Sequence, residues 1–206
     1  MGGFKNRKNY CTMILTNRIV CNKGESRSAF AEKVKSICEK LAINPNWLMV
    51  VMLHESGINA QAVNKQKGDH SDACTRSYYR ATGLIQFMPT TAMWLGTSTQ
   101  ALYKMNNLQQ LDYVYKYFKP YSGRIKSYYD LYMITFWPAA IGKPDNYVIQ
   151  SSTIPASVVA ERNPSLDINR DGKITVGEAK QIMLKAIPVE FLNDVLSDDE
   201  KKSSGS

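Results

Sequence analysis

Apolar residues recur at helical spacing along much of the chain. The first such series is Phe30, Val34, Ile37 and Leu41, and a second is Leu108, Leu111, Tyr115 and Phe118. Spacings of three and four residues place each series on one face of a helix, where it can meet the core. Regular alternation, the pattern of a strand, occurs only in "CTMILTNRIVC". The sequence therefore predicts a mainly α fold.

A further helix is predicted in "INPNWLMVVMLHESG", which is mostly apolar on every side. Asn44 is a favourable N-cap, Pro45 suits the first helical position, and Gly57 is a natural stop. We therefore expect a buried helix with Glu55 in its last turn.

The residues from Ile58 to Thr82 are polar and predict a long loop, which in a compact domain is usually functional. Beyond this loop, Pro89 can open a short helix that ends near Gly96. The segment "SYYDLYMITFWPAAIG" predicts another apolar helix, stopped by Pro138.

These patterns divide the chain into four parts. Residues 1–25 mix basic, polar and short apolar pieces, and we expect an extension that is weakly structured or packed on the main domain. The main domain covers residues 26–150, and a C-terminal segment covers residues 151–196. The remaining residues, 197–206, read "SDDEKKSSGS" and are predicted to be disordered.

The charge balance narrows the choice of partners. The 206 residues carry a formal charge of +8, which favours polyanions such as nucleic acid, anionic lipid or an acidic cell-wall polymer. Basic residues are dispersed, and RNP, zinc-finger and helix-turn-helix signatures are absent, so a nucleic-acid partner is not expected. No apolar run is long enough for a membrane span, and the N-terminal residues are too polar for the core of a signal peptide.

The four cysteines do not define a site. Cys11, Cys21, Cys38 and Cys74 lack CxxC spacing, which argues against zinc, and as disulfides they allow three pairings. The redox compartment and the oligomeric state stay open.

Glu55 is the candidate for acid or base chemistry. A metalloprotease HExxH motif needs a second histidine where Ile58 stands, and GxSxG, phosphate-loop and dinucleotide motifs are absent. The negative end of the helix dipole and the apolar residues before Glu55 both disfavour its charged form, which would keep the carboxyl protonated near neutral pH. The alternative is an ordinary, partly exposed glutamate at the end of a helix.

Three short blocks add to this picture. They are Glu55-Ser56, Gly83-Leu84-Ile85-Gln86 and Pro89-Thr90-Thr91-Ala92. With these blocks in this order, residues 26–142 resemble the SLT-type lytic transglycosylases. These enzymes cleave peptidoglycan and are relatives of goose-type lysozyme. The resemblance implies a lysozyme-like helical domain that cleaves the MurNAc–GlcNAc bond of peptidoglycan glycan strands.

The resemblance also implies roles for individual residues. Glu55 becomes the catalytic acid, and Ser56, Gly83, Ile85 and Gln86 lie along the sugar-binding groove. Gly83 would let the backbone approach the substrate, although a plain loop glycine explains it nearly as well.

The chain departs from the family in one block. Where the family has Ala-Tyr-Asn-Ala-Gly, this sequence reads "ITFWPAAIG", and Phe136 lacks the hydroxyl group of the family's tyrosine. That role is either lost or passed to Tyr132, although Tyr132, Phe136 and Trp137 could equally belong to the core.

The mechanism depends on whether a second carboxylate takes part. An inverting muramidase needs one to hold a water molecule, whereas a transglycosylase uses a single Glu as acid and then as base. Asp69 and Asp72 are the acidic residues between the blocks, and their alternative interpretation is as solvated loop residues.

The C-terminal segment contains a second motif, "DINRDGKITVGE", which matches the EF-hand calcium loop at every required position. The predicted ligands are Asp167, Asn169, Asp171, Lys173 through its carbonyl, Thr175 and Glu178. A single EF-hand-like loop of this kind predicts a structural Ca²⁺, and some lytic transglycosylases carry a similar site.

Two functions therefore compete. The first is an enzyme that degrades the bacterial cell wall, in the periplasm or outside the cell, as a muramidase, a transglycosylase or a bacteriophage endolysin. The second is a non-catalytic wall-binding or phage structural module that kept a lysozyme-like fold. Glu55 favours the enzyme, and the altered "ITFWPAAIG" block favours the module.

Overall fold

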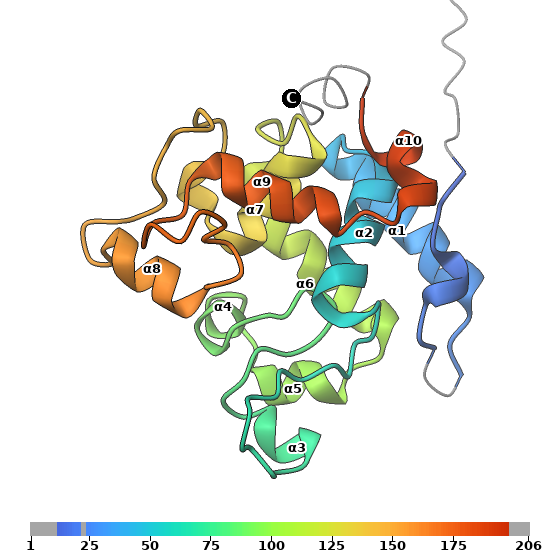
Figure 1. The fold of residues 1–206 in the computed structure, drawn as a ribbon. Coiled ribbons are helices and arrows are strands. Elements are labelled where there is room, and N and C mark those ends of the chain that lie inside the picture. Colours follow the sequence, from blue (N-terminus) through green and yellow to red (C-terminus); the bar gives the residue numbers. More distant parts are fainter. Residues whose placement is uncertain (1–11, 22–23, 198–206) are drawn as a thin grey trace, which may run out of the picture.

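Helices dominate the structure, a computed structural model that describes residues 12–21 and 24–197 (Figure 1). The α-helices are α1 Arg27–Leu41, α2 Pro45–Ser56, α3 Ala73–Arg76, α4 Pro89–Trp94, α5 Thr99–Lys104, α6 Asn107–Phe118, α7 Tyr128–Phe136, α8 Ala156–Arg162, α9 Val176–Lys185 and α10 Leu192–Val195. Short 3-10 turns are η1 Thr16–Arg18, η2 Lys119–Tyr121, η3 Pro138–Ala140 and η4 Val189–Phe191. Within the described ranges β pairing is limited to isolated bridges, which confirms the predicted mainly α fold.

Helix α2 forms the centre of the body. The side chains from Leu48 to Met52 are completely buried, and α2 packs against α1, α7 and α10. Its ends follow the sequence signals, because the Asn44 side chain accepts a hydrogen bond from the Asn46 amide at 2.9 Å and Gly57 ends the helix at φ 66°. The apolar residues on all sides of α2 are therefore explained by its central position.

Residues 12–21 pack on the main domain. The buried Asn46 side chain accepts a hydrogen bond from the Ile14 amide at 3.1 Å and donates one to the Thr12 carbonyl at 3.3 Å. The strand pattern in this segment was misleading, since Leu15 has a positive φ of 62° and the chain turns into η1. Residues 1–11 lie outside the described residues.

The polar stretch between α2 and α4 is mostly irregular, as predicted, with one short helix that the sequence analysis did not anticipate. This helix, α3, begins after Asp72, whose side chain accepts a hydrogen bond from the Thr75 amide at 3.0 Å. Figure 1 shows α3, α4 and α5 in the lower part of the molecule, below the body that holds α1, α2, α7 and α9.

The C-terminal segment packs on the same body. The Trp47 indole donates a hydrogen bond to the Val195 carbonyl at 2.7 Å, and the Tyr128 hydroxyl donates one to the Met183 carbonyl at 2.9 Å. Contacts therefore run from both α2 and α7 to this segment. Of the predicted disordered end, residues 198–206 lie outside the described residues.

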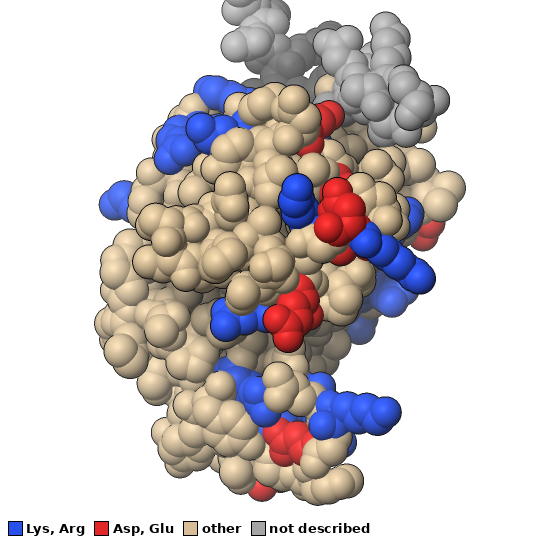
Figure 2. Space-filling model, turned by 60° about the vertical axis from the view of Figure 1, so that its left-hand side comes forward, with Lys and Arg blue, Asp and Glu red and all other residues tan. Residues whose placement is uncertain are grey.

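The surface and the cysteines add two observations. Figure 2 shows a face on which basic and acidic side chains are interspersed among uncharged ones, in keeping with the dispersed charge of the sequence. Cys21, Cys38 and Cys74 are free, Cys11 lies outside the described residues, and burial raises the pKa of the Cys38 thiol to about 12. None of the described helices is long and apolar enough to cross a membrane.

Candidate functional site

Glu55 lies in the last turn of α2, where its carboxyl group is largely withdrawn from water. Burial raises the pKa of Glu55 from 4.5 to about 7, because desolvation penalises the charged carboxylate. Burial also raises the pKa values of Tyr117, Tyr128 and Tyr132, and the negative charge of Glu55 raises them further. Three phenols on α6 and α7 therefore lie close enough to Glu55 to sense its charge.

Ser56 connects the end of α2 to the second motif block. Its hydroxyl group lies 3.0 Å from the Met52 carbonyl and 2.9 Å from the Leu84 carbonyl, and it accepts a hydrogen bond from the Asn59 amide at 3.2 Å. The group that the resemblance assigns to substrate binding thus holds the turn around Leu84 beside the acidic residue.

Residues 82–87 form a tight turn. The amides of Thr82 and Phe87 each donate to the carbonyl of the other, at 3.1 and 2.9 Å. Gln86 adopts a positive φ of 51°, and its side-chain amide donates to the carbonyls of Ala62 at 3.2 Å and Gly83 at 3.1 Å. Ile85 is buried. The second motif block is therefore a rigid unit attached to α2 through Ser56.

Gly83 is required by a side chain that the sequence analysis did not single out. A Cβ atom at Gly83 would lie 2.3 Å from Oε1 of Gln110, and the residue has a φ of 86°. The buried Gln110 side chain accepts a hydrogen bond from the Leu84 amide at 2.9 Å and donates to the carbonyls of Ala60 and Leu102, both at 2.7 Å. A close approach to Gln110 therefore explains this glycine without a substrate.

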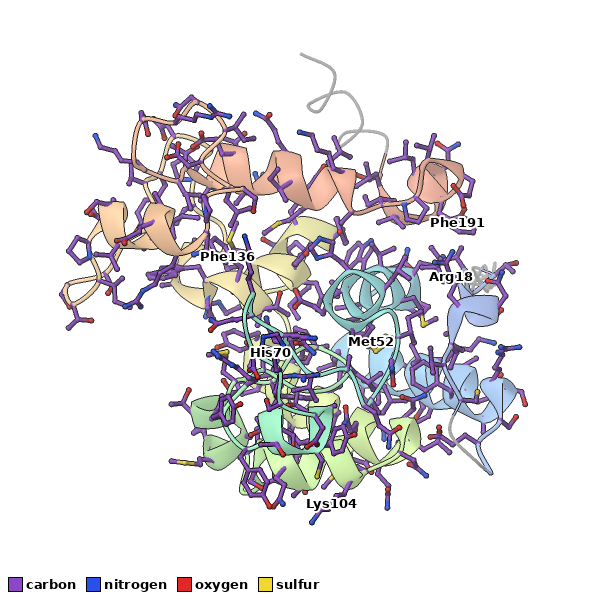
Figure 3. The ribbon with its side chains drawn as sticks, turned by 60° about the horizontal axis from the view of Figure 1, so that its bottom comes forward. Arg18, Met52, His70, Lys104, Phe136 and Phe191 are labelled. Atoms are coloured by element: carbon purple, nitrogen blue, oxygen red, sulfur yellow. The ribbon has the colours of Figure 1, made fainter. Side chains whose placement is uncertain are left out.

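Tyr132 reaches the site from α7. Its side chain is buried, and its hydroxyl group is hydrogen-bonded to Nδ1 of His54, the neighbour of Glu55. In Figure 3 Met52 of α2 lies in the interior and Phe136 at the end of α7, whereas Arg18, Lys104 and Phe191 lie at the periphery. Tyr132 is thus a core residue that contacts His54, the residue before the candidate acid.

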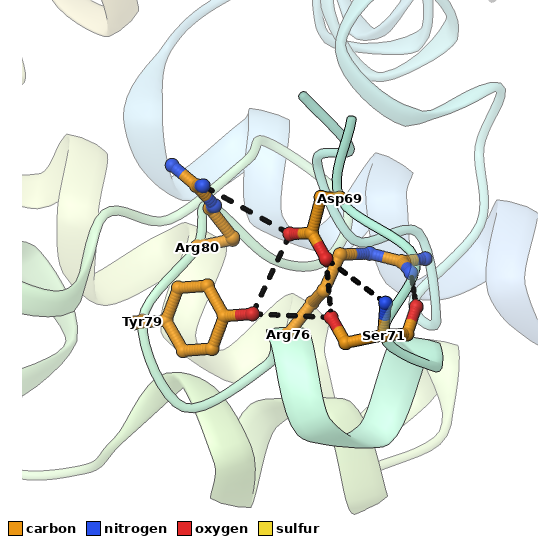
Figure 4. Close-up of polar contacts among 5 residues, drawn as sticks. All are labelled: Asp69, Ser71, Arg76, Tyr79 and Arg80. Carbon is orange, nitrogen blue, oxygen red and sulfur yellow. Dashed lines mark hydrogen bonds and ion pairs between the residues drawn. The ribbon is translucent and has the colours of Figure 1, made fainter. Parts of the chain in front are cut away.

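Asp69 is held inside the loop (Figure 4). It accepts hydrogen bonds from the Ser71 amide at 3.0 Å and the Ser71 hydroxyl at 2.5 Å, and from the Tyr79 hydroxyl at 3.4 Å. Nη2 of Arg80 lies 3.9 Å from Oδ2 of Asp69. The hydrogen bonds from Ser71 lower the pKa of Asp69 and outweigh desolvation, and the charges of Arg76 and Arg80 lower it further.

Asp72 has a similar local role at the start of α3. Hydrogen bonds from the Thr75 amide and hydroxyl, at 3.0 and 2.8 Å, lower the pKa of Asp72. Both loop aspartates are therefore ionised at neutral pH, while Glu55 retains a large protonated fraction. Among the three carboxyl groups, Glu55 is the one suited to donate a proton.

The predicted calcium loop lies between α8 and α9. The Asp171 amide donates both to Oδ1 of Asp167 at 3.1 Å and to Oδ1 of Asn169 at 3.0 Å, so these two oxygens lie close together. Glu178 accepts hydrogen bonds from the amides of Ile168 and Asn169 at 3.1 and 3.3 Å and also caps α9. Burial acts to raise the pKa of Glu178, but these hydrogen bonds and those from Thr175 lower it overall.

The donor set of this loop fits Ca²⁺ in its chemistry, because every predicted ligand atom is an oxygen. No group of three His, Cys, Asp or Glu side chains placed to hold a metal ion occurs in the described part of the chain. Ile174, inside the loop, is buried and pairs through its carbonyl with the Ile149 amide at 2.8 Å. The loop is therefore attached to residues 147–149 in place of a partner hand.

A cavity of about 680 Å³ lies between α7, η3 and α9, away from the motif blocks. Its lining includes Tyr129, Met133 and Lys180 and does not include Glu55. The candidate site therefore consists of Glu55, the three phenols whose pKa values its charge raises, and the turn held by Ser56 and Gln110.

Part of the chain matches a known protein family. Residues 32–119 match the family model described as Transglycosylase SLT domain. No curated protein and no solved structure matches the chain. The matched segment contains Glu55 and all three motif blocks and ends at Lys119, before α7 and the calcium loop. Proteins with this domain are lytic transglycosylases, and the match supports a domain of the lytic transglycosylase and lysozyme-like superfamily over residues 32–119.

Proposed function

We propose that this protein degrades peptidoglycan by cleaving the MurNAc–GlcNAc glycosidic bond, with Glu55 as its single general acid and base. The observation that carries the proposal is the raised pKa of the Glu55 carboxyl group. Burial raises this pKa to about 7, and Glu55 lies in the matched domain beside the turn of residues 82–87. A carboxylic acid that is still protonated near neutral pH can transfer its proton to a leaving oxygen.

In this mechanism Glu55 first donates its proton to the glycosidic oxygen as the bond to the sugar carbon breaks. The resulting carboxylate then acts as a base toward a hydroxyl group of the same sugar. It accepts the hydroxyl proton while the hydroxyl oxygen attacks the sugar carbon. No water is consumed, and Glu55 ends protonated, so one carboxyl group completes the cycle. The local hydrogen bonds of Asp69 and Asp72 support this single-residue mechanism over an inverting hydrolase.

The proposed partner is the glycan strand of the bacterial cell wall, in the periplasm or outside the cell. The formal charge of +8 supports this choice, because a basic surface is attracted to an anionic wall. The substrate itself follows from the family match, since peptidoglycan is the substrate of SLT domains.

We also propose that a structural Ca²⁺ binds residues 167–178. Asp167, Asn169, Asp171, Thr175 and Glu178 would supply side-chain oxygens, and Lys173 its carbonyl. When bound, the cation would neutralise the carboxylates of the loop at the start of α9. Glu178 would then exchange its amide hydrogen bonds for the cation.

Replacing Glu55 by Gln tests the catalytic proposal, because Gln keeps the shape but cannot transfer a proton. Lysis of a purified cell-wall suspension should fall by several orders of magnitude while the helical circular dichroism is retained. A variant that keeps more than a tenth of the activity would refute the assignment.

Matched controls are Asp69→Asn and Asp72→Asn, which should each change lysis less than threefold. A loss at either that equals the loss at Glu55 would indicate a second catalytic carboxylate.

The alternative function, a wall-binding module, is favoured by Phe136 in the altered family block. It would be supported if the native protein sediments with the wall suspension without clearing it.

A further inference from the structure

The cavity between α7, η3 and α9 is built by the part of the chain that follows the matched domain. Its lining begins at Ser127, whereas the family match ends at Lys119. On α7, Tyr132 contacts α2, and the next residue, Met133, lines the cavity. The cavity therefore shares α7 with the candidate site but is separate from it. Its volume of about 680 Å³ is within the range of small-ligand sites.

Contacts at both ends of α9 hold the sides of the cavity in place. At the start of this helix, the Gly177 amide donates a hydrogen bond to the Asp145 carbonyl at 2.9 Å, and Lys180 forms an ion pair with the Asp145 carboxylate at 2.7 Å. Near its end, the Met183 carbonyl accepts a hydrogen bond from the Tyr128 hydroxyl of α7 at 2.9 Å. The space between the two helices is thus formed without a ligand.

The floor of the cavity is apolar. Met133, Ala140 and Val176 line it and are almost completely buried, and Ile141 and Leu184 are half-buried beside them. Such a surface favours the burial of methyl groups of a ligand. It disfavours a phosphodiester chain, whose charged groups would lose water without gaining partners on the floor.

The rim of the cavity carries more positive than negative charge. Lys143, Lys180 and Lys185 stand against Asp130 and Asp145. Lys180 is paired with Asp145, and the Asp130 carboxylate accepts a backbone amide at 2.9 Å. Among the described residues, Lys143 and Lys185 form no ion pair. The rim therefore offers two ammonium groups to an anionic ligand.

These two lysines lie toward opposite ends of α9. Lys185 is the last residue of the helix, whereas Lys143 is close in sequence to Asp145, which meets Gly177 at the helix start. A helix rises 1.5 Å per residue, so Gly177 and Lys185 are separated by about 12 Å along the axis. An extended peptide covers this distance in about four residues.

We propose that this cavity binds the peptide stem of peptidoglycan, with one carboxylate at Lys143 and another at Lys185. The choice of ligand rests on the proposed function. The stems are short peptides of alanine, glutamate and a diamino acid, so they combine methyl groups with free carboxylates. The methyl groups meet the apolar floor, and the carboxylates meet the two unpaired ammonium groups of the rim.

An NMR titration with the synthetic peptide Ala-D-γ-Glu-Lys-D-Ala tests this binding without a glycosidic bond. We expect saturable shifts of the methyl signals of Met133 and Leu184. In the variant that combines Lys143→Gln and Lys185→Gln, Kd should rise about fivefold, because two exposed ion pairs are lost. Signals that do not shift, or a Kd that does not change in this variant, would overturn the proposal.

The matched control combines Lys65→Gln with Lys104→Gln. Both lysines are exposed and outside the lining of the cavity, so this variant loses the same charge without changing the rim. Its Kd should stay within about twofold of the native value, since distant exposed charges are screened by salt. A rise equal to that of the rim variant would overturn the proposal, because it would show attraction to the net charge alone.

Two further probes define the ligand. The same peptide with its carboxylates converted to amides should bind about fivefold more weakly to the native protein and no longer distinguish it from the rim variant. Inorganic phosphate should not displace the peptide at equal concentration. Displacement would overturn the proposal in favour of a general anion site.

The outcome is independent of the catalytic proposal. Glu55→Gln should bind the peptide with the native Kd, whether or not it still lyses cell walls. Peptide binding by a protein that does not clear a wall suspension would leave this inference standing and remove the enzymatic function. Lysis without peptide binding would remove this inference alone.

Discussion

At the scale of the residue, the burial of Glu55 should be visible in the stability of the protein. Because its folded-state pKa is raised to about 7 from 4.5, the fold favours the protonated form. The stabilising effect of protonation is fully present below about pH 4.5 and is lost as the pH rises through about 7.

We therefore predict that Glu55→Gln becomes more stable relative to the native protein as the pH rises. Between pH 5 and pH 8 the difference in the free energy of unfolding should move in favour of the variant by up to about 3 kcal/mol. Urea denaturation of both proteins at the two pH values measures this change. If the difference in the free energy of unfolding does not depend on pH, Glu55 is solvated and its pKa is not raised by the fold.

Part of this site can be predicted from single residues in the sequence. The apolar run before Glu55 and the stop at Gly57 indicate a carboxyl group at the end of a buried helix. The phenols around it come from helices that start more than fifty residues later, and sequence spacing carries no information on which of them meet Glu55. Gln110 did leave a signal, as an amide four residues before Val114 that continues the buried face of α6 toward its N-terminus.

At the scale of the element, the turn of residues 82–87 depends on the pair formed by Gly83 and Gln110. Gly83→Ala forces a left-handed φ on a residue with a Cβ atom and places that atom 2.3 Å from the Gln110 side chain. We predict a loss of about 2 kcal/mol or more in the free energy of unfolding, measured by chemical denaturation.

The matched control is the same substitution in a Gln110→Ala background. Shortening Gln110 removes the clash and leaves only the backbone strain, so Gly83→Ala should cost at least 0.5 kcal/mol less there, the low end of the coupling between residues in contact. Equal costs in the two backgrounds would show that Gln110 is not what this glycine accommodates.

The ends of the main helices follow closely from capping residues, prolines and glycines in the sequence. The exceptions have physical reasons. Asn44, Pro45 and Gly57 set the ends of α2, and Pro138 follows the end of α7. The strand pattern of the N-terminal segment was misleading because its backbone is paired with the buried Asn46 side chain and not with a neighbouring strand. Helix α3 is too short to show a period in the sequence.

At the scale of the whole molecule, the calcium loop offers a test of how the C-terminal segment is stabilised. Without a cation, the repulsion among Asp167, Asp171 and Glu178 acts against the closed loop. A ligand bound by the folded form alone stabilises it by about 2.7 kcal/mol at a hundredfold excess over Kd. We predict that a chelator lowers the melting temperature and exposes the region after Gln150 to proteolysis.

The same sample should keep its lysis activity in chelator at temperatures where the fold survives, because the loop is not part of the chemistry at Glu55. An unchanged melting curve would remove the calcium site. Complete loss of lysis with an intact fold would show that calcium shapes the active site through α9 and α7, which meet where Tyr128 bonds to Met183.

The packing of the chain ends is the feature that the sequence leaves most open. The same first turn of α2 binds the N-terminal residues through Asn46 and the C-terminal residues through Trp47, the latter across 148 positions. Such contacts join segments with no common pattern, so they emerge only in the folded chain. They tie the flanking segments to the helix that ends in Glu55.

The chemistry at Glu55 is tested most directly by mass spectrometry of peptidoglycan digested with the native protein. A single Glu acting as acid and then base, with attack by a hydroxyl of the substrate, predicts soluble fragments with anhydro sugar ends. It also predicts that Glu55→Gln releases none. Reducing ends in their place would contradict the single-residue mechanism and show that water attacks the sugar, and fragments released equally by Glu55→Gln would contradict the role of Glu55 itself.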